Sequence, residues 1–177
     1  DHETAEMAVQ ASLTGHLVFS TLHTNDSAGA ITRLVNMGIE PFLVTSSTIA
    51  IQAQRLVRRV CQDCKEAYTA DAETIAEIGL DPKDPKNQTM YNAIGCPKCS
   101  DRGYFGRTGI FELLLMTPKV QQMALEGSDS NAIKREARRD GMITLREDGA
   151  YRATLGLTTV EEIMRVTRDD IIDEIPE

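Results

Sequence analysis

Thr14-Gly15-His16-Leu17-Val18-Phe19-Ser20-Thr21-Leu22-His23-Thr24-Asn25 is the stretch that decides the fold class. Its apolar run at residues 17–22 is short and contains β-branched residues, which favours a strand over a helix. Helical patterns flank the run: Asp1 is placed to cap one helix that Gly15 ends, and Asn25 or Asp26 caps the next. A buried strand between two helices is typical of an α/β sheet.

The rest of the chain continues this alternation. Pro41 suits a first helical position and predicts a helix that extends to about Ala53. Strands are expected at residues 55–60 and 109–116, with a short helix at about 71–78 between them. Beyond residue 116 we expect helices, with N-caps or capping-box pairs at Thr117, Ser130, Thr144 with Glu147, and Thr159 with Glu162.

Composition limits the possible functions. The 177 residues are 41% hydrophobic and carry a formal net charge of −8, which argues against a chain that coats nucleic acid. Much of the acid lies in residues 161–177, and we expect the tail 169–177 to be solvated. No apolar run approaches the ~18 residues of a membrane span, and no signal peptide is recognisable. The chain opens without Met on an apparent helix start, so we expect the start to be cut.

All the cysteines form two C-x-x-C pairs, Cys61 with Cys64 and Cys96 with Cys99, separated by 31 residues. Two such pairs supply four thiolates for one tetrahedral ion, and the sulfur ligand set best suits zinc. A disulfide pair and a redox C-x-x-C are the alternatives, but the chain has no secretory signal and the pairs are matched. Such a four-ligand site is closed, so we expect it to stabilise a small lobe.

His23 follows the predicted strand, where open α/β sheets bind ligands. Thr24, Asn25 and the next helix N-terminus offer groups that suit phosphate. By local pattern alone, His23 is more often a loop residue and His16 a satisfied histidine. The basic groups are interpreted as solvated faces: Arg55, Arg58 and Arg59, and Lys134, Arg135, Arg138 and Arg139.

Motifs in one order across nearly the whole chain resemble the type II secretion and type IV pilus assembly ATPases. Residues 14–25 resemble their histidine box, and Asp1–Glu6 resembles the end of the acidic segment that precedes it. Details at residues 26–30 and 37–42 look more like the secretion branch than the pilus branch. Further matching segments are residues 54–59 before the first cysteine pair, 103–104 with 106–112, 140–142 with 145–149, 158–162 and 165–167.

The resemblance implies a RecA-like P-loop NTPase core that assembles as a homo-hexamer on the cytoplasmic face of the bacterial inner membrane. ATP hydrolysis with Mg²⁺ would drive a membrane platform and extend a pseudopilus, with cytoplasmic domains of membrane proteins of the secretion system as partners and no nucleic acid. His23 and His16 would sense the phosphates, and Glu3, Thr24 and Arg55 would lie near the nucleotide. The chain would divide into residues 1–60 (C-terminal part of the core), 61–106 (zinc lobe), 107–168 (strand and helical subdomain) and 169–177 (acidic tail).

The family's phosphate-binding loop, G-x-x-x-x-G-K-[ST], does not occur in these residues, and the catalytic Glu would precede Asp1. Without the loop Lys and its backbone N–H groups nothing cradles the β and γ phosphates, so this chain alone is expected to be inactive. Two alternatives stay open: a type IV pilus assembly ATPase, and a non-catalytic, zinc-stabilised protein-binding module. A zinc-ribbon nucleic-acid binder is disfavoured by the net charge.

Overall fold

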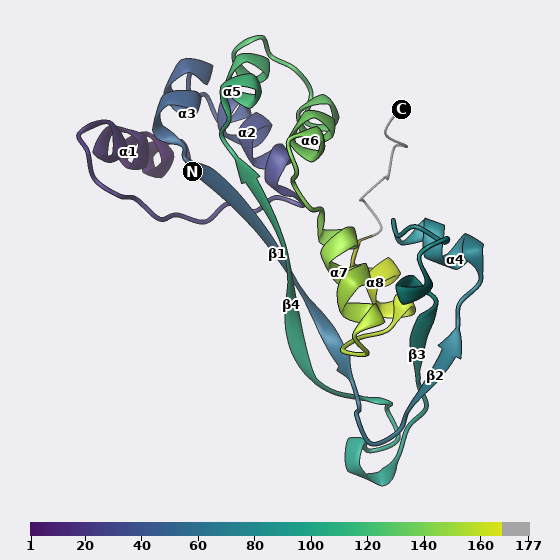
Figure 1. Ribbon diagram of the computed structural model, residues 1–177. Coiled ribbons are helices and arrows are strands. Elements are labelled where there is room, and N and C mark those ends of the chain that lie inside the picture. Colours follow the sequence, from purple (N-terminus) through teal and green to yellow (C-terminus); the bar gives the residue numbers. More distant parts are fainter. Residues whose placement is uncertain (168–177) are drawn as a thin grey trace. The chain divides into compact units, whose positions relative to one another are not determined.

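The computed structural model describes residues 1–167, which divide into two compact units (Figure 1). Among the described residues, the first unit combines Asp1–Ala53 with Glu112–Met142, and the second combines Gln54–Phe111 with residues 143–167. Two long strands, β1 (Ala50–Val60) and β4 (Tyr104–Leu115), pair with each other, and each begins in one unit and ends in the other. The predicted acidic tail 169–177 lies outside the described residues. The mixed α/β class is confirmed.

Helices dominate the first unit and gather around the ends of β1 and β4 that belong to it (Figure 1). They are α1 (His2–Leu13), α2 (Ser27–Asn36), α3 (Pro41–Ser47), α5 (Pro118–Leu125) and α6 (Ser130–Arg139). Small and branched apolar side chains fill the interior, because each helix turns one apolar stripe inward. The core includes Ala28, Ile31, Val44, Leu114, Val120 and Ile133, all fully or almost fully buried.

Local signals set most helix starts as predicted. Asp1 accepts from Thr4 N at 2.9 Å, and Asp26 accepts from Gly29 N at 2.8 Å. Thr117 caps α5 before its N1 proline. One prediction was wrong by a residue: α6 is capped by Asp129, whose carboxylate accepts from Ala132 N, and Ser130 is the first helical residue. A carboxylate also interacts with the helix dipole, so it competes well with a neighbouring hydroxyl.

The predicted strand at residues 17–22 does not form. These residues have no regular secondary structure, and the side chains of Leu17 and Phe19 are 72% and 89% exposed. A buried strand needs a neighbour to satisfy its N–H and C=O groups. Within residues 1–167 the strand pairs are β1 with β4 and β2 with β3, so residues 17–22 have no such neighbour.

The helix that begins at Pro41 ends at Ser47, well before the predicted end near Ala53. The hydroxyls of Ser46 and Ser47 bond back to the carbonyls of Phe42 and Leu43, a contact that competes with helical hydrogen bonding. Extended backbone begins at Thr48, and β1 starts at Ala50. The predicted strand at residues 55–60 is therefore the second half of a longer strand.

The second unit holds a hairpin-like sheet and a helix pair. Strands β2 (Lys65–Thr69) and β3 (Thr89–Ala93) pair antiparallel, in register from Lys65 opposite Ala93 to Thr69 opposite Thr89. The expected short helix is α4 (Ala72–Glu77). The other elements are η1 (Pro85–Asn87), η2 (Pro97–Cys99), α7 (Leu145–Thr154) and α8 (Val160–Val166). Their core comprises Ala70, Ile75, Ile78, Met90, Ala150 and Ala153.

One of the two predicted capping boxes is complete. Thr144 and Glu147 exchange both capping bonds at the start of α7. At α8 the Thr159 hydroxyl accepts from Glu162 N, but the Glu162 carboxylate accepts from the backbone N–H and guanidinium of Arg58 instead. Burial alone would raise the pKa of Glu162, but hydrogen bonds from Arg165 and Arg58 outweigh it and lower that pKa to about 2. Glu162 thus fixes α8 to β1.

Candidate functional site

The four cysteines come together in the second unit. Their sulfur atoms all lie within 4.8 Å of one another, and the cysteines are free of disulfides. Individual Sγ–Sγ distances are 4.0 Å for Cys61 and Cys96, 3.9 Å for Cys64 and Cys99, and 3.8 Å for Cys96 and Cys99. A tetrahedral ion with Zn–S bonds of about 2.3 Å requires sulfur atoms about 3.8 Å apart. The geometry therefore fits a single zinc ion.

Two glycines allow the backbone to fold around this cluster. Gly95 and Gly103 have φ angles of +112° and +73°, in the region that favours glycine. A Cβ at Gly103 would lie 2.7 Å from the backbone carbon of Ala93, and one at Gly95 would lie 2.8 Å from Asp101 O. Both positions therefore exclude a side chain by conformation and by space.

Backbone N–H groups donate to the sulfurs unequally. Cys99 Sγ accepts from Cys96 N and Gly103 N, each at 3.2 Å, whereas Cys64 Sγ accepts from Gly95 N at 3.3 Å. Burial raises the pKa of the Cys64 thiol to about 12. Burial acts in the same direction on Cys99, but its N–H donors outweigh it and lower the pKa to about 7. N–H donors of this kind stabilise thiolates and orient them as metal ligands.

The two histidines of the segment at residues 14–25 are both exposed and lie on irregular backbone. His16 is tied to the end of α1, because its Nδ1 lies 3.1 Å from Thr14 Oγ1 and its backbone N–H donates to Ala11 O. His23 lies three residues before the α2 cap, Asp26. Within residues 1–167 no hydrogen bond or ion pair joins Glu3, His16 and His23 to one another. The predicted nucleotide residues are thus not gathered into one site here.

The other predicted nucleotide residues have separate surroundings. Glu3 is exposed in the first turn of α1. Thr24 is half-buried, and its hydroxyl donates to Asp26 O at 3.1 Å. Arg55 lies on β1 in the second unit, where its guanidinium donates to Gln54 O. Their roles in nucleotide binding stay predictions.

Carboxylates occupy the N-terminus of α2, which was expected to offer N–H groups to phosphate. Gly29 N donates to Asp26 Oδ1, and Ser27 N donates to Glu112 Oε1 at 2.9 Å. The Ser27 hydroxyl also donates to Glu112 Oε1. Two of the first donors of this helix are therefore committed to side chains of the protein itself.

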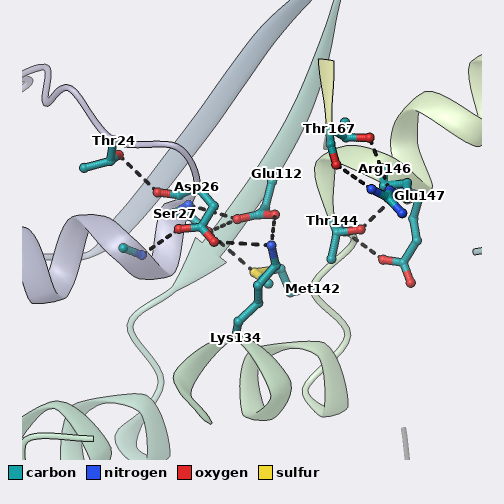
Figure 2. A network of polar contacts seen from close by, with 11 residues as sticks. Thr24, Asp26, Ser27, Glu112, Lys134, Met142, Thr144, Arg146, Glu147 and Thr167 are labelled. Carbon is teal, nitrogen blue, oxygen red and sulfur yellow. Dashed lines mark hydrogen bonds and ion pairs between the residues drawn. The ribbon is translucent and has the colours of Figure 1, made fainter. Parts of the chain in front are cut away.

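These contacts belong to a buried charged network that connects three elements of the first unit (Figure 2). Glu112 on β4 and Lys134 on α6 are only 1% and 8% exposed. Lys134 Nζ lies 3.3 Å from Asp26 Oδ2 and 3.8 Å from Glu112 Oε2, so one ammonium group is placed between two carboxylates. Met142 Sδ lies 3.7 Å from the Ser27 hydroxyl and closes the network. The interpretation of Lys134 as part of a solvated face was wrong.

Comparison with known proteins assigns the family. The family model described as "Type II/IV secretion system protein" matches residues 1–165. A Pseudomonas aeruginosa protein, "Type II secretion system protein E", is 52% identical over 170 residues, which are 96% of this chain and 33% of that protein. The chain belongs to the type II/IV secretion system protein family.

Relatives from both branches are similar to this family member. "Type II secretion system ATPase E" of Vibrio cholerae is 50% identical over 96% of the chain, and "Type IV pilus assembly ATPase PilB" of Thermus thermophilus is 47% identical over 94%. The chain spans about a third of the length of the secretion relatives and 19% of PilB. Among the helices of residues 1–167, none is both long and apolar enough to cross a membrane.

The sequence of this family member contains a signal for the buried network that was missed. In β4 the side chains of Ile110, Glu112 and Leu114 are buried while those between them are more exposed. A carboxylate in an inward register needs a cation or several donors. In the sequence Glu112 is the single charge in the apolar run at residues 110–115, which indicates a buried charge, although its partners on α2 and α6 are 85 and 22 residues away and could not be named.

Proposed function

We propose that this chain is the C-terminal part of a cytoplasmic ATPase that powers type II protein secretion by extending a pseudopilus. The proposal is carried by one observation: identity of 52% and 50% to type II secretion proteins, one of them named an ATPase, over 96% of the chain. The first unit would complete a RecA-like core with strands from the rest of the protein, and residues 17–22 would become a strand there. The predicted domains, with boundaries at residues 60, 106 and 168, belong to the same proposal.

His23 and His16 would act as phosphate sensors in that core. Both are exposed and thus accessible to a ligand, and an imidazole can donate to a γ-phosphate oxygen. Loss of the phosphate would then remove a contact and shift the segment at residues 14–25, whose backbone lacks regular structure. Glu3, Thr24 and Arg55 are further proposed nucleotide neighbours, with ATP and Mg²⁺ held mainly by residues outside this chain.

The cysteine cluster would hold one structural zinc ion. Cys61, Cys64, Cys96 and Cys99 supply four ligands and leave no open position, so the bound ion contributes coordination bonds and no Lewis-acid chemistry. A closed site of this kind would stabilise the turns that join β1, β2, β3 and β4 in the second unit.

Assembly and location are part of the proposal. The full-length protein would form a homo-hexamer on the cytoplasmic face of the inner membrane and move an inner-membrane platform, with cytoplasmic domains of secretion-system membrane proteins as partners. The similarity to PilB of Thermus thermophilus supports a second candidate, a type IV pilus assembly ATPase. If the full-length protein hydrolysed no ATP, a zinc-stabilised binding module would describe it better.

ATP hydrolysis by the full-length protein, by this chain alone and by two full-length histidine variants tests the proposal. We expect turnover by the full-length protein and none above a mock preparation for this chain, because its 177 residues contain no phosphate-binding loop. His23→Ala should lower turnover by about 10²-fold or more, the range for loss of a donor to developing charge.

His2→Ala is the matched control. His2 is also exposed, but its ring bonds the carbonyl of Met37, which follows the C-terminal end of α2, whereas His23 precedes the N-terminal end. This control should leave turnover unchanged. Normal ATP hydrolysis by His23→Ala would contradict the role of His23 as a phosphate sensor. ATP turnover by this chain alone would contradict the need for the phosphate-binding loop.

A further inference from the structure

The segment that carries both histidines is fixed at its two ends. At one end His16 and Thr14 bond each other and the last turn of α1. At the other end Thr24 bonds Asp26, the cap of α2. Between these ends the backbone is irregular and most side chains are exposed. The position of His23 therefore depends on how firmly the second anchor, residues 24–27, is held.

That second anchor is held by charge rather than by apolar packing alone. Ser27 is fully buried and donates twice to Glu112, while Asp26 caps α2 and pairs with Lys134. Gly29 leaves room for the cap, because a Cβ there would lie 2.7 Å from Asp26 Oδ1. The contacts come from β4 and α6, 85 and 108 residues away in sequence, so the anchor is tied to the body of the unit.

We propose that Lys134 and Glu112 are positioning residues that hold residues 24–27 and, through them, set the position of His23 for phosphate contact. The inference rests on the proposed function of His23. Neither residue touches the nucleotide in this account; each acts through the α2 cap. Burial supports the proposal, because a buried charge pair has few alternative arrangements and therefore holds the α2 cap in one geometry.

A double-mutant cycle in the full-length protein separates positioning from general stabilisation. The variants are Lys134→Met, His23→Ala and the two combined, measured as kcat and KM for Mg·ATP. Lys134→Met should lower kcat by about 10-fold or more with a smaller change in KM, since misplacement of a reacting group by about 1 Å costs up to 10²-fold. In the His23→Ala background the same substitution should change kcat by less than about two-fold.

Lys134→Arg should restore much of the rate, because it returns a cation to the site between Asp26 and Glu112. If Lys134→Met slows both backgrounds equally, the residue acts through stability and the inference is overturned. If His23→Ala is slow but Lys134→Met hydrolyses ATP at the normal rate, the inference fails while the proposed function stands. If His23→Ala is normal, the proposed role of His23 fails first, and no positioning role toward it remains.

A milder variant covers the case in which Lys134→Met does not fold, since it leaves a buried Glu112 without its cation. Asp26→Asn keeps a side-chain oxygen that can accept from Gly29 N, and Asn is as favourable an N-cap as Asp. The substitution removes the ion pair with Lys134. It should give the same dependence on His23 with a smaller loss of kcat. Amide hydrogen exchange of residues 24–29 should also become faster, and unchanged exchange would overturn the inference.

Glu162→Gln in the second unit is the matched control. Glu162 is as deeply buried as Glu112 and is paired with Arg58 and Arg165, and within residues 1–167 no hydrogen bond or ion pair joins it to α2. Whatever its effect on kcat, that effect should be equal in the presence and absence of His23, and exchange of residues 24–29 should not change. Coupling of Glu162 to His23 as strong as that of Lys134 would contradict a specific positioning role.

Discussion

The cysteine cluster and the histidine segment are the two regions with the clearest functional patterns in the sequence. The structure gathers the cysteines into one cluster, but it leaves residues 14–25 without regular secondary structure. The chain itself brings all four sulfurs within 4.8 Å, through turns next to β1, β2, β3 and β4. The histidine segment, residues 14–25, resembles the family's histidine box but has no regular structure, and its Leu17 and Phe19 are largely exposed. The difference teaches that the first region has all its partners in this chain, whereas a strand at residues 17–22 needs neighbours that residues 1–167 do not provide.

The largest effect should come from taking metal away from the cluster. We expect one zinc per chain, and Cys99→Ser should reduce both zinc content and protection of the turns at residues 61–64 and 95–103. Structural zinc contributes about 10–16 kcal/mol of apparent binding free energy in small zinc peptides, so its removal should unfold these turns. Elemental analysis and amide hydrogen exchange measure the two effects.

Lys98→Ala is the control for that experiment. Lys98 lies in the same C-x-x-C turn but is exposed, and its ammonium pairs with Asp63 across the two turns. An exposed pair adds little stability, so zinc content should be unchanged. Exchange at residues 14–25 should not respond to zinc in either variant. A zinc-free protein with fully protected turns would show that the chain needs no metal to build the cluster.

These two regions also mark what the sequence could predict. The cysteines were identified because ligand type and spacing are local properties, and the caps Asp1, Asp26 and Thr117 for the same reason. The buried state of Lys134 could not be predicted, because it depends on Asp26 and Glu112, which are distant in sequence. The strand expected at residues 17–22 depends on pairing with neighbouring strands, and the local sequence does not show whether such strands are present.

A pair of glycine substitutions compares how tightly the backbone is built in the two regions. Gly103→Ala should destabilise the second unit by about 3 kcal/mol, because Ala at positive φ costs about 1–2 kcal/mol and its Cβ must also displace the Ala93 backbone. Gly15, in the histidine segment, has a φ angle of +95°, but nothing lies within 4 Å of the Cβ that Gly15→Ala would add. This substitution should cost about 1 kcal/mol, the conformational part alone. Urea unfolding of this chain, with and without zinc, measures the free energy of unfolding of both variants. Equal decreases would contradict the proposed difference in backbone packing between the two regions.

The smallest expected effect concerns the apolar residues of the histidine segment. Phe19→Ser should change the free energy of unfolding of this chain by no more than about 0.5 kcal/mol, because the side chain is 89% exposed. Leu114→Ala, at a fully buried position in the same unit, should cost about 2–5 kcal/mol in the same assay. If residues 17–22 join a sheet in the full-length protein, Phe19→Ser should cost about as much free energy of unfolding there as Leu114→Ala, because the substitution would then remove a buried apolar side chain. A Phe19→Ser substitution that is silent in both proteins would argue that this segment stays a solvated loop and that His23 is not at the end of a strand.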